Sequence, residues 1–179
     1  SEGARLSRLI NNVLELSKLE KSQRHINLQT GTFEEVLAET EALMAEKLKQ
    51  EGFSLSIAPG RLRPFKYDRE VMIQVLINLI ENSMKFGQSA SVREIGIRTV
   101  QEPDGVKIMV SDTGPGIPRH ALKKIFNDFY RVDNSLTRAT RGTGIGLALV
   151  KKFIHLMGGT VTAADNEGAG CTITIRLPA

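Results

Sequence analysis

Several features that would restrict the class of protein are absent from this sequence. It has one cysteine, Cys171, among 179 residues, which excludes an internal disulfide framework and is compatible with a reducing cytosol. No apolar run approaches the roughly 18–20 residues of a membrane span, and no signal peptide opens the chain. These absences predict a cytoplasmic domain, whose parent protein could still be anchored to a membrane upstream.

A strong excess of charge of one sign is absent too. The 24 basic and 20 acidic residues give a net charge of +4. Proteins that bind nucleic acid usually carry a clustered basic stripe, so we expect no nucleic-acid partner, although the mild excess suits a polyanionic ligand. Hydrophobic residues make up 41% and charged residues 25% of the chain, which is typical of a globular protein with one real core.

The stretch around which the chain is organised is 68–86, DREVMIQVLINLIENSMKF. Its apolar residues recur at helical spacing, Asp68 is a favourable N-cap, and Gly87 is expected to end the helix. Residues three and four apart share a helix face, so one polar stripe is expected. Its members are Asn78, Asn82, Lys85 and Phe86. Because asparagine is a poor helix former, this stripe indicates a polar site.

Periodicity and turn residues predict the other elements. Helices are expected over about 1–25, from a capping box at 32–35 to near Gly52, from about Arg119, and over 145–157. Extended segments are expected at 26–30, 53–57, 64–67, 92–100, 106–112, 160–164 and 171–177. Residues 130–143, which include Arg131, Arg138 and Arg141, are expected to form a mobile loop. The sum is an α+β two-layer sandwich, with three main helices on a mixed sheet of about five strands, preceded by one long helix.

The N-terminal helix carries a wide apolar stripe. Its members are Leu6, Leu9, Ile10, Val13, Leu14 and Leu16. Two heptads are too few to indicate a coiled coil. The helix could pack on its own domain, but the width of the stripe favours a partner helix or a second subunit.

A glycine-rich segment, RGTGIGLALV, precedes the last predicted helix. Gly142, Gly144 and Gly146 would let the backbone approach a phosphate at the positive end of that helix. The dinucleotide-binding fingerprint would need glycine at Leu147, and GK[ST], HRD and DFG are absent. Alone, the segment is as consistent with a plain turn at a helix start as with a phosphate cradle.

A second loop, VSDTGPGIP, follows an apolar strand that ends at Asp112. A carboxylate only accepts hydrogen bonds. It would therefore select adenine, whose amino group donates, over guanine, whose oxygen does not. Gly114 and Gly116 would let the chain pass flat against the base. The alternative is an ordinary Asp turn after an edge strand.

Taken in order, four segments resemble the N, G1, F and G2 boxes of sensor histidine kinases. They are NLIENSMKF, DTGPGIP, IFNDFYR and GTGIGLAL. Those kinases share the GHKL ATP-binding superfamily with type II topoisomerases, a heat-shock chaperone and mismatch-repair ATPases. The resemblance to the catalytic domain covers 28–179, and 1–27 resembles the second helix of the family's dimerisation and phosphotransfer hairpin.

The resemblance implies a site for ATP and Mg²⁺. It assigns Asn82 to the metal, with Asn78 near it, and Lys85 and Arg131 to the phosphates, so that Asn82, Lys85 and Arg131 carry the catalysis. It places Phe86 by the adenine or ribose and Asp112 on the adenine amino group. The other implied ATP contacts are Gly114, Gly116, Ile117, Tyr130, Gly142, Thr143, Gly144, Ile145, Gly146, Leu147 and Thr172.

The sequence departs from the family pattern at two positions. Asn127-Asp128 lies between Phe126 and Phe129, where the F box commonly has Glu-Pro, which puts the docking of the lid in doubt. Cys171 lies where relatives often have a hydroxyl residue near the base, which puts one water-mediated adenine contact in doubt.

The position four residues before Asn82 separates two reactions. Relatives that hydrolyse ATP resemble one another in having a glutamate at that position, which serves as general base. In this sequence the position is occupied by Asn78, which cannot take a proton. Glu81 lies about 100° round the helix from Asn82 and should face away. The sequence therefore favours transfer to a histidine over a topoisomerase-like ATPase. A nucleotide-binding regulatory switch without transfer stays open.

None of the three histidines fits the family's acceptor pattern, in which an acidic residue and a Leu-Arg-x-Pro run follow. His25 lies at a helix end, His120 in a surface turn, and His155 within the last helix, where we expect a packing role. We therefore expect an acceptor helix upstream of this fragment. The implied partners are that helix, a response regulator receiver domain, and a second copy in a full-length homodimer.

Overall fold

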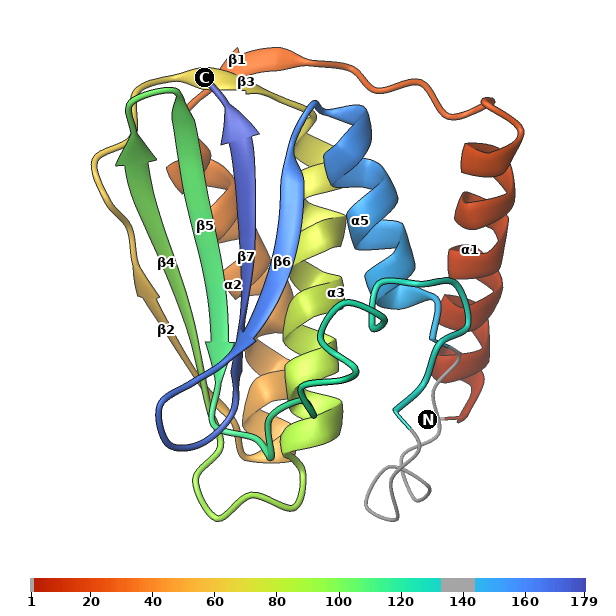
Figure 1. Cartoon of the computed structure of the whole chain (residues 1–179), viewed down its shortest axis with the longest axis vertical. Coiled ribbons are helices and arrows are strands. Elements are labelled where there is room, and N and C mark those ends of the chain that lie inside the picture. Colours follow the sequence, from red (N-terminus) through yellow and green to blue (C-terminus); the bar gives the residue numbers. More distant parts are fainter. Residues whose placement is uncertain (1, 133–143) are drawn as a thin grey trace.

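A computed structural model describes residues 2–132 and 144–179 of the chain. Its helices are α1 (Glu2–Glu20), α2 (Phe33–Glu51), α3 (Arg69–Gly87) and α5 (Gly146–Leu156). Its strands are β1 (Gln29–Gly31), β2 (Ser54–Ala58), β3 (Phe65–Tyr67), β4 (Glu94–Glu102), β5 (Gly105–Asp112), β6 (Thr160–Asp165) and β7 (Cys171–Pro178). Helices α2, α3 and α5 cover one face of a sheet, as Figure 1 shows. The predicted α+β two-layer sandwich with a preceding long helix is confirmed.

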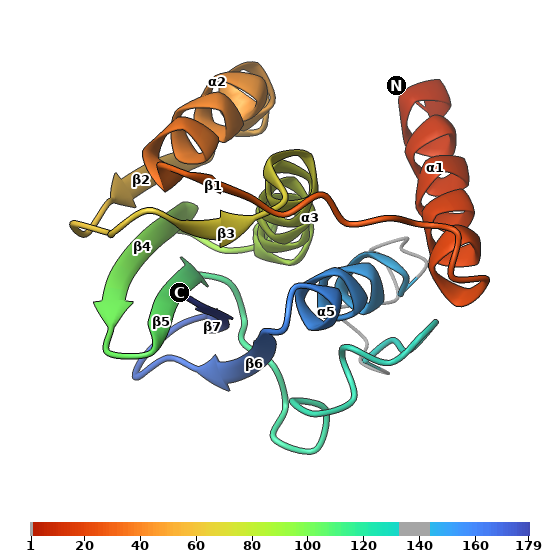
Figure 2. The ribbon, with the colours of Figure 1, turned by 90° about the horizontal axis from the view of Figure 1, so that it is seen from above.

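The main sheet is mixed, as predicted. Its strand order is β2-β4-β5-β7-β6, with β2 parallel to β4 and the other neighbours antiparallel. Strands β1 and β3 form a separate antiparallel pair that runs across one end of the helical layer (Figure 2). As β5 and β7 are antiparallel neighbours, the end of β5 and the start of β7 lie together.

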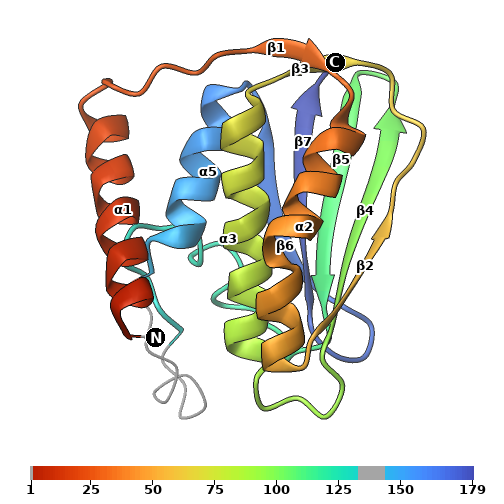
Figure 3. The ribbon, with the colours of Figure 1, turned by 180° about the vertical axis from the view of Figure 1, so that it is seen from behind.

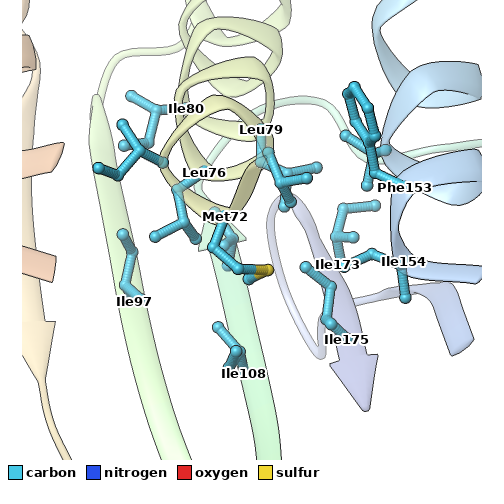
Figure 4. Close-up of a cluster of buried hydrophobic side chains, with 14 of the residues drawn as sticks. Met72, Leu76, Leu79, Ile80, Ile97, Ile108, Phe153, Ile154, Ile173 and Ile175 are labelled. Atoms are coloured by element: carbon cyan, nitrogen blue, oxygen red, sulfur yellow. The ribbon is translucent and has the colours of Figure 1, made fainter. Parts of the chain in front are cut away.

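The core lies between the sheet and α3, whose apolar residues project into it as their spacing predicts (Figure 4). Helix α3 contributes Met72, Leu76, Leu79 and Ile80, and the residues that face them are Ile97, Ile108, Phe153, Ile154, Ile173 and Ile175. All ten are buried. Burying a side chain of this size stabilises the fold by about 1.5–3 kcal/mol, so α3 is fixed firmly against the sheet.

Helix α3 begins as the sequence predicts. The side chain of Asp68 accepts a hydrogen bond from the Val71 N–H at 3.1 Å, and its other oxygen accepts from the Asn27 N–H at 2.9 Å. The same carboxylate thus caps α3 and holds the segment that arrives from α1. At the other end the helix runs one residue further than predicted, because Gly87 is helical and buried against Phe53.

Helix α2 also has the predicted ends. Thr32 is its N-cap, but no side-chain capping bond is present, so the capping box is only partly formed. Gly52 ends it in a left-handed conformation with φ 71°.

The short helix predicted from Arg119 is wrong, because the described residues 119–129 form a succession of turns. Isolated three- and four-residue backbone bonds replace a helical ladder there, as is usual for a segment too short to stabilise a helix.

Helix α1 buries only part of its apolar stripe. Leu16 is 4% exposed and joins the core, and α1 lies beside α5 (Figure 3). Four further apolar side chains of the helix are exposed: Leu6, Ile10, Val13 and Leu14. Packing of part of the stripe on the domain is confirmed by Leu16, and packing of the exposed part on a partner stays a prediction.

Glu81 of α3 connects three helices. Its Oε1 lies 2.8 Å from a guanidinium nitrogen of Arg8 in α1 and 2.9 Å from Nζ of Lys47 in α2. The Glu81 side chain is 14% exposed, so solvent screens these contacts less than it screens surface pairs. The carboxylate helps to hold the first half of α1 on the domain.

Glu81→Gln is expected to loosen α1. Losing a partly buried charged hydrogen bond costs about 1 kcal/mol, which makes amide exchange in α1 roughly fivefold faster. Hydrogen–deuterium exchange of peptides from α1 measures this directly. Glu46→Gln is a matched control, because Glu46 accepts only from Gln50 of its own helix among the bonds described. Equal exchange in the two variants would contradict this role of Glu81.

Candidate functional site

The predicted site residues that the structure describes gather at one end of the sheet. The second half of α3, the end of β5 and the start of β7 lie toward the lower end of the molecule in Figure 1, and α5 begins above them, beside the middle of α3. The sheet and α3 carry many buried core side chains, so side chains on them are held on rigid elements. This arrangement suits precise positioning of a ligand.

Asn78 lies in α3 and faces the start of α5. It is 9% exposed, and a Cβ atom at Gly146 would lie 3.8 Å from its Oδ1. Its Nδ2 atom is buried without a hydrogen-bond partner. An unsatisfied buried amide costs about 1–3 kcal/mol, so this donor is placed where a ligand with acceptor oxygens would satisfy it.

Asn82, Lys85 and Phe86 follow Asn78 along α3, and all three are partly exposed. The Lys85 ammonium lies 4.7 Å from the centre of the Phe86 ring, in a cation–π contact. A carboxamide, an ammonium and an aromatic ring are therefore close together on the last turns of α3, as the helical spacing predicts.

Asp112 is the most densely hydrogen-bonded side chain at this end of the sheet. Its Oδ1 accepts from the Gly114 N–H at 2.9 Å and from the Cys171 N–H at 3.4 Å. Its Oδ2 accepts from the Ser83 hydroxyl at 3.1 Å and the Cys171 thiol at 3.5 Å. The carboxylate is half-buried and thus held by three segments of the chain.

Cys171 lies next to Asp112, whereas Thr172, one of the implied ATP contacts, points to the other side of strand β7. Side chains alternate across a strand, and Thr172 bonds to Ser111 at 2.8 Å and Asn166 at 2.6 Å on the open face of the sheet. Burial, with the adjacent Asp112 carboxylate, raises the pKa of the Cys171 thiol. The thiol is therefore a protonated donor at neutral pH.

The loop after β5 is tied back to the hairpin between β6 and β7. The Ile117 N–H donates to Asp165 at 2.7 Å, and the Asn166 side chain donates to the Asp112 carbonyl at 3.0 Å. Gly116 has φ 79°, and a Cβ there would lie 3.0 Å from Asp165. Gly114 is buried near the end of α3, with Gly87 within ordinary contact. These contacts fix the backbone that passes the predicted base site.

Gly144 meets the end of the predicted F box. Its carbonyl accepts from the Phe129 N–H at 3.2 Å, and with φ 70° a Cβ there would lie 2.6 Å from the Tyr130 carbonyl oxygen. Tyr130 packs against the core, whereas Phe129 is 64% exposed. Asp128 is one of the two residues that depart from the F-box pattern, and its Oδ2 atom lies 3.8 Å from Nζ of Lys152 in α5. The structure thus brings this segment to the start of α5.

The remaining predicted ATP contacts differ in burial, and some of them lie outside the described residues. Ile145 is buried in the core and Leu147 packs against it, so either would meet a ligand through its backbone. Arg131 is exposed. Gly142 and Thr143, with most of the predicted mobile loop, lie outside the described residues.

The predicted orientation of Glu81 is confirmed, since it bonds to α1 and α2 away from Asn78. The packing role predicted for His155 is wrong, because its side chain is exposed on α5. His25 and His120 are exposed as well.

Within the parts of the chain that the structure describes, no helix has both the length and the apolar character that crossing a membrane requires.

The donor set fits a magnesium nucleotide better than a metal bound by protein alone. Among the described residues, no group of three or more His, Cys, Asp or Glu side chains could hold a metal ion. Mg²⁺ accepts few protein oxygens and takes the rest of its ligands from water and phosphates. The carboxamide oxygen of Asn82, the unsatisfied Asn78 amide and the start of α5 match that requirement.

Residues 67–179 match the family described as histidine kinase-, DNA gyrase B-, and HSP90-like ATPase. The chain belongs to this family. Sensor histidine kinase WalK of Bacillus subtilis is 33% identical over 99% of the chain, and hybrid signal transduction histidine kinase D of Dictyostelium discoideum is 37% identical over 97%. The matches cover 29% and 11% of those proteins, so the chain spans a minor part of its curated relatives.

Solved structures of histidine kinases have the same fold. Full-length ShkA in complex with AMPPNP superposes with a TM-score of 0.83 at 26% identity, over 99% of this chain and 37% of that one. The catalytic domain of ThkA superposes with a TM-score of 0.72 at 25% identity, over 85% of this chain and 97% of that one. The resemblance to a sensor histidine kinase ATP-binding domain is therefore confirmed.

Sequence reasoning missed Ser83, Asp165 and Asn166. Ser83 directly follows Asn82, but nothing in the pattern shows that its hydroxyl meets Asp112. Asp165 and Asn166 have the composition of an ordinary hairpin turn. Their contacts with the loop after β5 come from the pairing of β5 with β7, which a local pattern does not reveal.

Proposed function

We propose that this chain is the catalytic part of a sensor histidine kinase, which transfers the γ-phosphoryl group of ATP to a histidine on another helix for relay to a response regulator. The observation that carries the proposal is the convergence of Asn78, Asn82 and the start of α5 beside Asp112. The two asparagines and the start of α5 suit the phosphates of a nucleotide, and Asp112 suits its base. Within the chain, residues 28–179 form the ATP-binding domain and residues 1–27 belong to a phosphotransfer hairpin.

The residues of α3 and α5 bind and orient the phosphates. Asn82 holds Mg²⁺ through its carboxamide oxygen, and the Asn78 amide donates to a phosphate oxygen. Lys85 and Arg131 neutralise phosphate charge, and the backbone N–H groups at the start of α5 donate to the phosphates. Mg²⁺ supplies further charge neutralisation when bound. Such positioning and charge neutralisation are most of what phosphoryl transfer requires.

Asp112 reads the base. Its carboxylate accepts from the 6-amino group of adenine, whereas guanine has at that position its O6 atom, which is also an acceptor. Two acceptors that face one another discriminate strongly between such ligands. The loop from Gly114 to Ile117 passes the base, and Phe86 packs beside the base or the ribose.

Transfer is favoured over hydrolysis because α3 presents no carboxylate to water at the position four residues before Asn82. Asn78 cannot take a proton, and Glu81 is engaged with Arg8 and Lys47 on another face of α3. An imidazole is already a nucleophile and needs little activation.

The exposed stripe of α1 supports the proposed partners. Leu6, Ile10, Val13 and Leu14 form an apolar face on a helix that already packs on the domain through Leu16. Such a face fits the companion helix of a hairpin or a second copy of α1. The proposed parent protein is a homodimer.

A labelling experiment tests the function. The chain is incubated with γ-labelled ATP, Mg²⁺ and a separate protein that contains an acceptor helix from the parent kinase. The expected result is base-stable, acid-labile phosphate on the partner and none on His25, His120 or His155. Absence of phosphohistidine under all conditions would favour a regulatory switch, and steady release of ADP without transfer would favour an ATPase. Label on one of the three histidines would overturn the external acceptor.

A further inference from the structure

We propose that Ser83 is a positioning residue for base recognition, which fixes the Asp112 carboxylate in the orientation that accepts from adenine. The inference deepens the proposed function and rests on it. Neither the sequence motifs nor the family match assigns a role to this residue.

Ser83 faces the interior from the helix that also carries Asn82. It is 7% exposed, and its hydroxyl lies 3.1 Å from Asp112 Oδ2. Serine lowers helix stability relative to alanine, and a buried hydroxyl costs free energy unless it is bonded. Ser83 offsets both costs through a hydrogen bond to a charged group, the stronger kind of hydrogen bond.

The four donors to Asp112 differ in strength. Two good donors hold it, one on each oxygen: the Gly114 N–H on Oδ1 at 2.9 Å and the Ser83 hydroxyl on Oδ2 at 3.1 Å. The Cys171 N–H and thiol lie farther away, at 3.4 and 3.5 Å. One strong donor on each oxygen fixes the plane of the carboxylate.

This arrangement leaves a replaceable position on the carboxylate. An ionised carboxylate has about four acceptor positions, so the four donors nearly fill them. The thiol is a weak donor and makes the longest contact, so it gives way to the amino group of adenine at small cost. Ser83 and Gly114 keep their bonds and hold the carboxylate while the exchange occurs.

Ser83 also links the two ends of the site. It is adjacent to Asn82 on α3, and Asp112 ends β5 in the sheet. The bond therefore fixes the base-reading carboxylate relative to the helix that carries the metal ligand. A nucleotide whose base is bound by Asp112 and whose phosphates are bound near Asn82 is aligned only while the distance between these two residues is kept.

Nucleotide affinities of the intact chain test the role. The probes are ATP and purine riboside triphosphate, which lacks the 6-amino group, each titrated calorimetrically with Mg²⁺. Ser83→Ala is expected to weaken ATP binding about fivefold, the effect of about one hydrogen bond, and to change the affinity for purine riboside triphosphate less than twofold. The ratio of the two affinities is insensitive to a general loss of stability, which would weaken both nucleotides alike.

Ser111→Ala is the matched control. Ser111 precedes Asp112, and its hydroxyl makes a similar bond, 2.8 Å to Thr172, on the opposite face of the sheet. The control should keep the wild-type ratio. Equal weakening of both nucleotides by Ser83→Ala, or an unchanged preference for ATP, would overturn the inference while the proposed function stands. A wild-type chain that binds neither nucleotide would overturn both.

Discussion

Asn82→Ala is expected to reduce phosphoryl transfer to the acceptor protein roughly a hundredfold, the usual cost of removing one preorganised group that stabilises developing charge. Asn82 is the only carboxamide on the last two turns of α3, and the Asn78 amide one turn earlier is proposed to bind a phosphate, so we expect no neighbour on that helix to replace the Asn82 oxygen. The fold should not suffer, because alanine is the better helix former. The unfolding temperature is therefore expected to stay the same or to rise slightly.

The rate of phosphohistidine formation measures this effect, with far-UV circular dichroism to follow unfolding. Gln74→Ala is a matched control, since it removes a half-buried carboxamide from the same helix outside the site. The control should transfer phosphate at the wild-type rate. Transfer by Asn82→Ala within threefold of wild type would show that the metal is held elsewhere.

Gly170→Ala is expected to cause the largest loss of stability, about 3–4 kcal/mol. Gly170 precedes β7 with φ 84°, a conformation that side chains disfavour, and a Cβ there would overlap the Asp112 carbonyl oxygen. That oxygen accepts from Asn166 at 3.0 Å. Relief of the clash must move the end of β5, so ATP affinity should fall together with stability.

Gly168→Ala separates the cost of the backbone conformation from the cost of the steric overlap with Asp112. Gly168 belongs to the same hairpin and has φ 110°, but a Cβ there would have no heavy atom within 4 Å. This variant therefore carries only the backbone cost, about 1–2 kcal/mol. Denaturant unfolding of both variants gives the comparison. Equal losses of unfolding free energy would contradict the close approach of Gly170 to Asp112.

Local patterns predict the elements that carry the site. The periodicity of α3 and its Asp68 cap are encoded within one stretch of sequence, and so is the Gly52 stop of α2. The helix expected after Arg119 is wrong because a few apolar residues do not offset the cost of helix nucleation. Local spacing is informative where a long run of residues shares one periodicity.

Positions that depend on tertiary register are harder to predict. A shift of one residue reverses the faces of a strand, so whether Cys171 or Thr172 lies beside Asp112 depends on the register of β7 against β5. Ser83 and Asp165 acquire their partners only when α3 and β6 pack beside the loop after β5. His155 lies on an apolar helix, but on its solvent side. Which residues of the α1 stripe are buried likewise depends on where α5 lies.

Titration of the unmodified chain with ATP and GTP in the presence of Mg²⁺ is the most direct test of the central claim, that the end of the sheet around α3 and Asp112 binds an adenine nucleotide. We expect ATP to bind at least tenfold more tightly than GTP, because guanine would place its O6 atom, an acceptor, against the Asp112 carboxylate, which only accepts. Asp112→Ala should abolish this preference. Failure to bind ATP, or equal affinity for ATP and GTP, would contradict the claim.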